Sequence, residues 1–272
     1  MTTHTSQNPQ KSLRDSLDWQ LSMGVDEAVV DDPTKEWLSP PIQSPRQSPA
    51  QVNAPTTQAS TADTPATNTK APLASADPPP DFAAAATLDE LRGMCLNFKA
   101  AEYLQKTATQ LVFADGSPDA DFMLVGEAPG ADEDRQGKPF VGASGQLLDK
   151  MLESINISRK QSAYITNIVL WRPPGNRTPT TEEIALFLPI LHRHIALIAP
   201  KVIMCLGKIA TQAMLGKPVS ILKTRGTWHE YNDCIPLMPS LHPAYLLRSP
   251  IQKAKAWQDL RLAYHKLATL QK

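Results

Sequence analysis

From residue 87 onward, short apolar runs alternate with segments whose apolar residues recur at helical spacing. Runs of this kind are typical of buried strands, and we expect them at 122–125, 163–169, 201–206, 226–231 and 235–238. Helical spacing predicts helices over 88–103, 145–155, 180–198, 208–215 and from Pro250 to the end. This alternation predicts an α/β fold, with a central, mostly parallel sheet of about four strands between two helical layers (α/β/α).

Residues 1–86 differ in composition from the rest of the chain. They hold 12 of the 25 prolines and are rich in Ser, Thr, Gln and Ala. Such a segment buries too little apolar surface to offset chain entropy, so we expect a disordered tail over 1–86 and one folded domain over 87–272. Trp19 and Trp37 in the tail have two interpretations, an incidental pair or a docking segment for a protein partner, and the first is favoured.

The zero net charge of the chain conceals a division between the two parts. The tail carries 5 Lys/Arg against 10 Asp/Glu, whereas residues 87–272 carry 22 against 17. A basic domain is weakly indicative of a partner such as DNA. The three cysteines form no C-x-x-C pair, and no segment has the length of a membrane span or the apolar core of a signal peptide. These features predict a cytoplasmic protein with reduced cysteines and no association with a membrane.

Four side chains that could take part in catalysis or binding lie where strands are expected to end. Glu127 follows the first strand, Asn167 lies near the end of the second, His242 follows the last, and Phe140 stands in a loop between turn residues. Loops at the carboxyl ends of parallel strands meet in one crevice, so we expect these groups to lie together. Taken singly, each residue also has a purely structural interpretation. Glu127 could cap a helix or form an ion pair, and Asn167 could close a turn. His242 could be a structural imidazole before proline, and Phe140 could belong to the core.

An aromatic face beside a side-chain amide suits a flat ring that forms hydrogen bonds. The Asn167 amide can accept from a ring N–H and donate to a ring carbonyl, which is the pattern of uracil and the reverse of cytosine. Such a base must leave the helical stack to reach the crevice, and stacking on Phe140 would partly offset that cost. His242 could then stabilise negative charge that develops on a departing base.

Three segments in order resemble the family 4 uracil-DNA glycosylases. Gly-Glu-Ala-Pro-Gly-Ala-Asp-Glu-Asp at 126–134 and Gly-Lys-Pro-Phe-Val-Gly at 137–142 are similar to the family's first motif. Ile-Thr-Asn-Ile-Val at 165–169, with Arg-Pro-Pro-Gly-Asn-Arg-Thr-Pro at 172–179, is similar to its middle segment. His-Pro-Ala-Tyr-Leu-Leu-Arg at 242–248 is similar to its second motif. The resemblance spans about residues 88–270, and it implies the uracil-DNA glycosylase fold.

The resemblance also implies roles for individual residues. Catalytic roles fall on Glu127, Asn167 and His242, where the imidazole would bond the uracil carbonyl as the glycosidic bond breaks. Base-binding roles fall on the walls and floor of the pocket: Gly126, Ala128, Pro129, Glu133, Phe140 and Asn167. Glu133 would lie where a thymine methyl would point. Residues 243–248 would enter the minor groove, with DNA contacts from Pro243, Tyr245, Leu246 and Arg248, and with Tyr245, Leu246 or Leu247 as the wedge.

The chain departs from the family at the iron–sulfur cluster that many members hold on four cysteines. One of the matching positions is Trp171, the helix over 182–191 has no cysteine, and the first region offers only Cys95. Cys205 and Cys234 fall on or beside strands, at positions that do not match. Because these clusters need thiolate ligands in a fixed array, we predict that no cofactor or metal is bound, with Trp171 and Phe187 as apolar replacements.

The predicted activity is hydrolysis of the N-glycosidic bond of uracil in DNA, as a monofunctional enzyme of base excision repair. No motif places a lysine for Schiff-base chemistry, and Ala128 stands where another branch of the superfamily has an aspartate base. Two alternatives stay open: a glycosylase with a broader range of deaminated bases, and a DNA-binding damage sensor without catalysis. We expect uracil-containing DNA as the partner and a monomeric protein.

Overall fold

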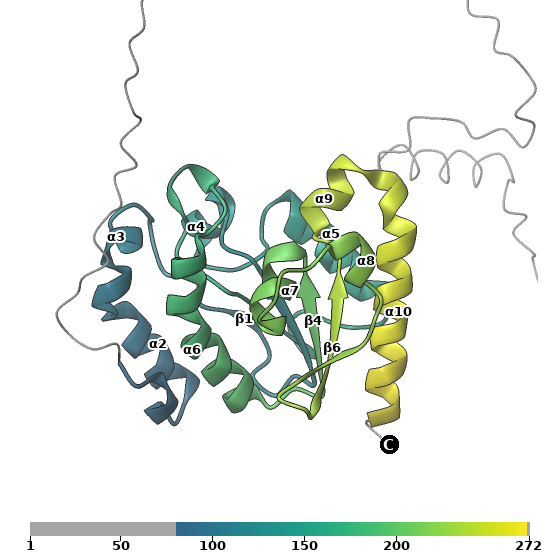
Figure 1. Cartoon of the computed structure of the whole chain (residues 1–272), viewed down its shortest axis with the longest axis horizontal. Coiled ribbons are helices and arrows are strands. Elements are labelled where there is room, and N and C mark those ends of the chain that lie inside the picture. Colours follow the sequence, from purple (N-terminus) through teal and green to yellow (C-terminus); the bar gives the residue numbers. More distant parts are fainter. Residues whose placement is uncertain (1–79, 271–272) are drawn as a thin grey trace, which may run out of the picture. The chain divides into compact units, whose positions relative to one another are not determined.

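The structure is a computed structural model that describes residues 80–270 of the chain. The predictions for the tail, including a docking role for Trp19 and Trp37, fall almost wholly on residues 1–79 and lie outside the described residues. Within the described range the chain forms one six-stranded sheet with the strand order β1-β3-β2-β4-β6-β5 and helices on both faces (Figure 1).

The four middle strands are parallel, as the sequence predicts. They are β3 (Ala163–Asn167), β2 (Phe122–Gly126), β4 (Val202–Leu206) and β6 (Ile235–Ser240). The edge strands β1 (Asp115–Gly116) and β5 (His229–Tyr231) are antiparallel additions that bring the number to six. Every residue of β2, β3 and β4 is buried, because a parallel sheet is covered on both faces, and this explains the uninterrupted apolar runs of β2 and β4.

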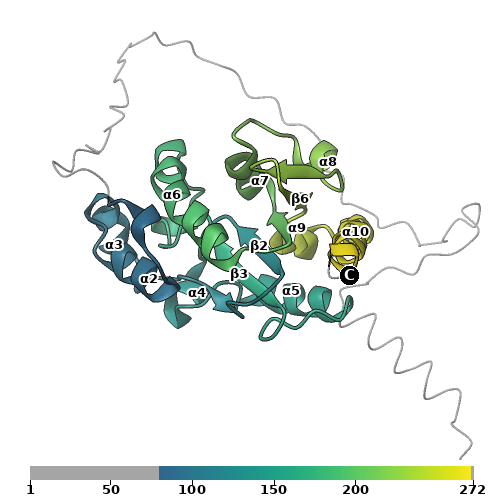
Figure 2. The ribbon, with the colours of Figure 1, turned by 90° about the horizontal axis from the view of Figure 1, so that it is seen from below.

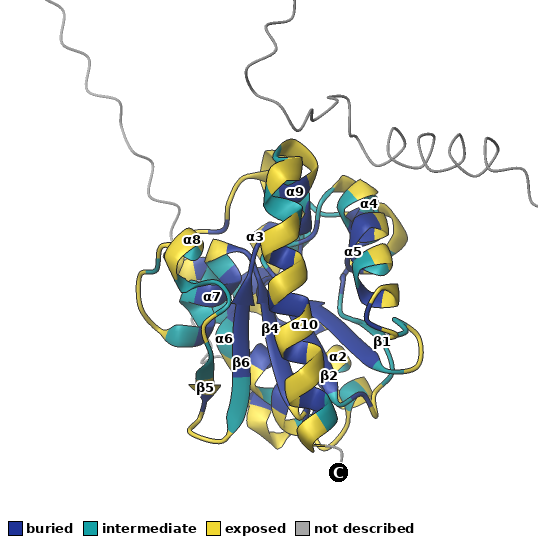
Figure 3. Cartoon of the chain, turned by 90° about the vertical axis from the view of Figure 1, so that its right-hand side faces the viewer, coloured by how far each residue is buried: buried dark blue, intermediate teal, exposed yellow. Residues whose placement is uncertain are grey.

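Alternate side chains of the strands pack into two cores on opposite faces of the sheet. Met123 and Val125 face a core completed by the helices α2 (Leu88–Leu96), α6 (Thr181–Ile198) and α7 (Lys208–Leu215). Phe122 and Leu124 face a second core completed by α5 (Ala143–Glu153) and α10 (Lys253–Leu270). Figure 2 shows these helices on either side of the strands, and Figure 3 shows α10 covering the buried strands with an exposed outer surface. The predicted three-layer α/β/α architecture is confirmed.

The first predicted helix, 88–103, is broken. α2 ends at Leu96, and after Asn97 and Phe98 the chain continues as η2 (Lys99–Ala101) and α3 (Glu102–Gln105). Phe98 turns inward, and its ring lies 5.1 Å from that of Phe82 and 6.1 Å from that of Phe187, both edge-on. Phe82, in η1 (Phe82–Ala84), is buried although it falls in the expected tail. The packed part of the chain therefore begins a few residues before Thr87.

Five short helical segments were not predicted from the periodicity. They are η1, α4 (Ala131–Gln136), η3 (Pro174–Asn176), α8 (Ile221–Thr224) and α9 (Pro243–Arg248), whereas η4 (Pro250–Gln252) falls within the predicted final helix. α4 contains the acidic run Asp132-Glu133-Asp134. Gly130 is its N-cap residue, a left-handed Gly137 ends it, and the three carboxylates lie in its first turn, where the positive end of the helix dipole stabilises them. The segment after β6 is helical from Pro243, which suits the first turn because proline lacks an N–H.

Helix α6 starts where the sequence places it. The Thr180 side chain accepts a hydrogen bond from the Glu183 N–H, and the Glu183 carboxylate accepts one from the Thr180 N–H. Among residues 80–270, no helix combines the length and the apolar character needed to cross a bilayer.

Candidate active site

A cavity of about 490 Å³ lies at the carboxyl ends of the parallel strands. β2 ends at Gly126, β3 at its register partner Asn167, and β6 at Ser240, two residues before His242. Ends of parallel strands share one edge of a sheet, and the loops that follow them meet there. The cavity is lined by Glu127, Ala128, Pro129, Gly130, Glu133, Phe140, Ser144, Asn167, Asn176, Arg177, His242, Ala244 and Arg248.

Asn167 is the last residue of β3 and is only 2% exposed. Its Oδ1 atom has no hydrogen-bond partner among the described residues. A buried amide oxygen without a partner is unfavourable, and in this position it is available to a ligand in the cavity. Gly126 is required beside it, because a Cβ at that position would overlap both Asn167 Oδ1 and the Phe140 ring.

Phe140 lies in the loop between α4 and α5 and is 5% exposed. Its backbone is left-handed, with φ of 54°, which is uncommon for an aromatic residue. The ring stacks on the His242 imidazole, with centroids 5.5 Å apart and planes 30° apart. Both residues line the cavity, so the stacked pair forms part of its wall.

His242 caps the N-terminus of α9. Its Nδ1 accepts a hydrogen bond of 3.1 Å from the Ala244 N–H, so in the neutral ring the proton is on Nε2. Burial lowers the pKa of His242 to about 4; the nearby Arg248 cation adds to the shift, and the Glu133 carboxylate opposes it. At neutral pH this imidazole is an uncharged hydrogen-bond donor.

Two carboxylates from the first motif line the cavity. Burial raises the pKa of Glu127 above its usual value, and a hydrogen bond with the Thr178 side chain opposes the shift. Glu133 is buried, and its Oε1 accepts hydrogen bonds of 3.0 Å from the N–H groups of Val141 and Gly142. Glu133 therefore also orders the loop that carries Phe140, a contact that the sequence did not reveal.

The residues of helix α9 differ in how far they are exposed. Arg248 lines the cavity and is exposed, Tyr245 is half-buried, and Pro243 is buried in the first turn. Leu246 is 1% exposed and packs with Leu147, Leu241 and Ala256. The expectation that Leu246 contacts DNA is therefore corrected: one face of a short helix must cover the core, and Leu246 lies on that face. Its neighbour Leu247 is 45% exposed.

Ser144, Asn176 and Arg177 also line the cavity, although the sequence assigned them no role, and so does Ala244 of the segment 243–248. Arg177 is held by Glu183, whose two carboxylate oxygens accept bonds of 2.6 and 2.7 Å from its guanidinium. The sequence feature that indicates a turn here is Gly-Asn after two prolines, in the Arg-Pro-Pro-Gly-Asn-Arg-Thr-Pro segment. In the structure Gly175 and Asn176 have the left-handed backbones of a tight turn. Composition alone did not indicate that this turn folds back over the strand ends.

Comparison with known sequences agrees with this arrangement. The profile of the uracil DNA glycosylase superfamily matches residues 113–261, which include every residue that lines the cavity. The chain belongs to the uracil DNA glycosylase superfamily. This membership confirms the superfamily, and the family 4 resemblance is confirmed by the type-4 relatives that follow.

Several curated relatives of this superfamily member are similar over most of their own length. A type-4 uracil-DNA glycosylase of Sulfurisphaera tokodaii is 42% identical over 149 residues, which are 52% of this chain and 68% of the relative. One of Thermotoga maritima is 42% identical over 147 residues, 54% of this chain and 76% of the relative. One of Archaeoglobus fulgidus is 40% identical over 165 residues, 58% and 82% respectively.

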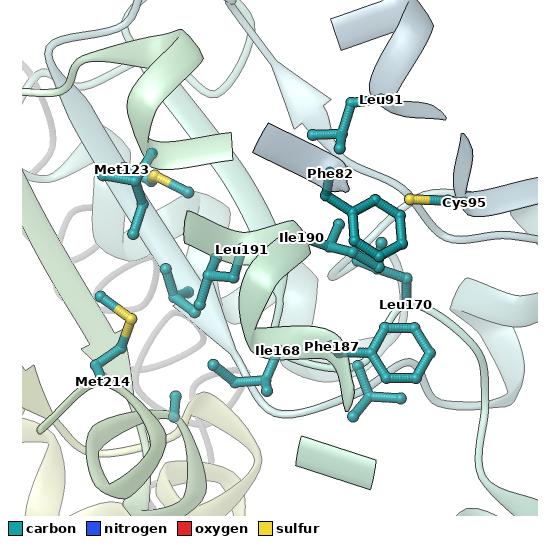
Figure 4. Packing of buried hydrophobic residues seen from close by; sticks show 14 of the residues in the cluster. Phe82, Leu91, Cys95, Met123, Ile168, Leu170, Phe187, Ile190, Leu191 and Met214 are labelled. Atoms are coloured by element: carbon teal, nitrogen blue, oxygen red, sulfur yellow. The ribbon is translucent and has the colours of Figure 1, made fainter. Parts of the chain in front are cut away.

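The residues of this superfamily member do not fit the iron–sulfur cluster that its family resemblance implies. Cys95 is buried among aromatic and aliphatic side chains, with Phe82, Leu91 and Leu170 near it in the same core (Figure 4). Phe187 and Trp171 are buried in this core as well. Burial raises the pKa of the Cys95 thiol to about 12, which disfavours a thiolate. Among residues 80–270, no three His, Cys, Asp or Glu side chains are grouped to hold a metal ion.

Proposed function

We propose that the protein is a monofunctional glycosylase that hydrolyses the N-glycosidic bond of uracil in DNA and leaves an abasic site for base excision repair. The observation that carries the proposal is the meeting of the Asn167 amide, the Phe140 ring and the His242 imidazole in one cavity. The names of the curated relatives support the same substrate, since they are type-4 uracil-DNA glycosylases.

Each group has a distinct task in this proposal. A uracil extruded from the helix stacks on Phe140, and the Asn167 amide accepts from the ring N–H and donates to a ring carbonyl. Asn167 Oδ1, which has no other partner among the described residues, gains one from the base. Cytosine presents the reverse pattern and leaves the amide unsatisfied, a difference of the kind that gives strong discrimination.

His242 acts on the leaving group. As the glycosidic bond breaks, the electron pair passes to the base, and negative charge gathers on its carbonyl oxygen. The Nε2–H of a neutral imidazole donates a hydrogen bond to that oxygen, and the low pKa of about 4 keeps the ring neutral without transfer of its proton. Water completes the hydrolysis on the sugar, near Glu127 and Ala128.

The remaining features belong to the same proposal. Among the described residues that line the cavity there is no lysine, which accords with hydrolysis without strand cleavage. Arg248, exposed at the cavity, supplies positive charge for the DNA backbone. Of the three candidate wedge residues Tyr245, Leu246 and Leu247, the exposed Leu247 is the one we propose, and Glu133 keeps the proposed exclusion of the thymine methyl. A reduced cytoplasmic location, a monomeric state and the lack of an iron–sulfur cluster complete it.

The test is a labelled oligonucleotide with one uracil, incubated with enzyme and then cleaved with alkali at abasic sites. We expect cleavage at uracil only, and a loss of about 10²-fold or more in rate for His242→Ala or Asn167→Ala. His265→Ala, an exposed imidazole on α10, is the matched control. Cleavage at hypoxanthine or at mismatched thymine would favour the broader glycosylase. Binding without cleavage would favour the damage sensor.

The cofactor prediction has its own measurement. Iron and acid-labile sulfide are assayed in protein purified without air, and we expect neither in stoichiometric amount. One cluster per chain would overturn the prediction.

A further inference from the structure

The left-handed backbone of Phe140 requires an explanation from its surroundings. A bulky residue with φ of 54° persists only where neighbouring groups determine its conformation. The position of this ring decides the shape of the cavity, because the ring is one wall of it. The groups that hold the Phe140 backbone therefore also set the geometry of the site.

Arg159, in the turn that precedes β3, holds the carbonyl groups of this loop. Its Nη1 donates to the Pro139 carbonyl at 3.1 Å, and its Nη2 donates to the Phe140 carbonyl at 2.8 Å. The guanidinium is fixed in turn by Asp149 of α5, whose Oδ1 lies 2.6 Å from Nε, and by Asp115 of β1, whose Oδ2 lies 3.3 Å from Nη1. All three guanidinium nitrogens are thus engaged within the fold.

The opposite side of the loop is held by Glu133, which accepts from the N–H groups that directly follow Phe140. The loop is therefore fixed through its carbonyls by a cation and through its N–H groups by an anion. Gly145 completes the enclosure, since a Cβ there would overlap the Phe140 carbonyl.

Arg159 is not placed to contact substrate. Its side chain is 14% exposed, and it is not among the residues that line the cavity. Its planar fork matches two adjacent carbonyls and two carboxylates, which a lysine point charge cannot reproduce. Its guanidinium is bonded to the two loop carbonyls and paired with the two aspartates, so it is not available to bind a phosphate.

We propose that Arg159 is a positioning residue that acts through Phe140, by fixing the backbone that aims the ring at the extruded base. The catalytic consequence rests on the proposed function, whereas the structural part does not. Loss of the fork would leave the carbonyls of Pro139 and Phe140 without their donor, and the loop would relax from its strained conformation.

The first experiment measures kcat/KM on the uracil oligonucleotide for Arg159→Gln and Arg159→Lys. Misplacement of a binding group by about 1 Å costs on the order of 10²-fold, so we expect a loss of about 10- to 100-fold for Arg159→Gln. Arg159→Lys should lie between it and the parent. The matched control is Lys160→Gln, which removes one positive charge from the exposed neighbour and should change kcat/KM by less than about twofold.

A double-mutant cycle with Phe140→Ala tests the route of the effect. If Arg159 acts through the ring, Arg159→Gln should lower kcat/KM by less than about threefold once the ring is absent, because the two changes are coupled. Equal losses in both backgrounds would overturn the proposal and make Arg159 merely structural.

Hydrogen exchange gives a readout that does not need activity. In Arg159→Gln, amide exchange should quicken in the peptide over 137–146, while the peptide over the distant strand β4 should stay protected. Unchanged exchange over 137–146 would overturn the proposal. An inactive parent enzyme with faster exchange in the variant would instead sink the proposed function and leave the role of Arg159 intact.

Discussion

Replacement of Asn167 by alanine should separate stability from activity. In the free protein the Asn167 amide is almost fully buried, and its Oδ1 has no partner among the described residues. Such a group costs the native state rather than stabilising it. The same amide is the group that we propose reads the base.

The expected magnitudes follow from these contacts. A buried polar group without a partner costs about 1–3 kcal/mol, and the alanine variant removes that cost. It also removes the packing of the amide beside Gly126, a loss of similar size. The free energy of unfolding should therefore change by less than about 1 kcal/mol in either direction. Excision should slow by about 10²- to 10³-fold, which is the effect of losing one preorganised polar group.

Urea unfolding and single-turnover excision on the same preparations provide the two numbers. Asn97→Ala is the matched control, because the exposed Asn97 closes α2 by donating to the Gly93 carbonyl at 2.9 Å. That variant should lose a little stability and keep full activity, the reverse pattern. If Asn167→Ala lost more than about 2 kcal/mol of stability and retained activity, the amide would be a structural turn residue and the reasoning would be refuted.

Three further predictions concern the groups around the cavity. The pKa of His242 is about 4 in the folded state against an ordinary value of 6.5, so the unfolded chain binds more protons between these pH values. The free energy of unfolding should therefore fall as the pH drops from about 6.5 to 4. Urea titrations at several pH values should show a smaller fall for His242→Gln. Gly145→Ala should displace a loop carbonyl and cost about 10²-fold in kcat/KM, whereas Gly93→Ala on α2, with open space around it, should raise the unfolding free energy by about 0.5–1 kcal/mol. Leu246→Ala should lose about 2–5 kcal/mol of stability, and Leu247→Ala should keep stability within about 0.5 kcal/mol but bind uracil-containing DNA more weakly.

The aromatic core beside α2 shows how this chain builds its fold at the place where its family resemblance implies a cluster. Phe82, Phe98 and Phe187 meet edge to face, and Cys95 lies among them as a small apolar side chain. In the cluster-free protein that we propose, these buried aromatic rings stabilise the fold here, because each removes a large apolar area from water.

The amino-acid order alone determined the parallel strands, the capping box at Thr180 and the joint placement of Glu127, Asn167 and His242 at one edge of the sheet. These features depend on local spacing and on the rule that parallel strands share a carboxyl edge. The same local signals failed at 88–103, because the helix breaks to let Phe98 reach two distant rings.

Only the tertiary structure decided which side of α9 faces the core, so that Leu246 is buried while Leu247 is exposed. It also decided that Arg159 donates a hydrogen bond to the Phe140 carbonyl, nineteen positions away in the chain. No motif around Arg159 indicates this contact. The physical reason is that periodicity describes contacts between near neighbours in the chain. Two features depend on packing that forms only when the whole sheet is assembled. They are the burial of one face of α9 and the hydrogen bonds from the Arg159 guanidinium to carbonyls far away in the chain.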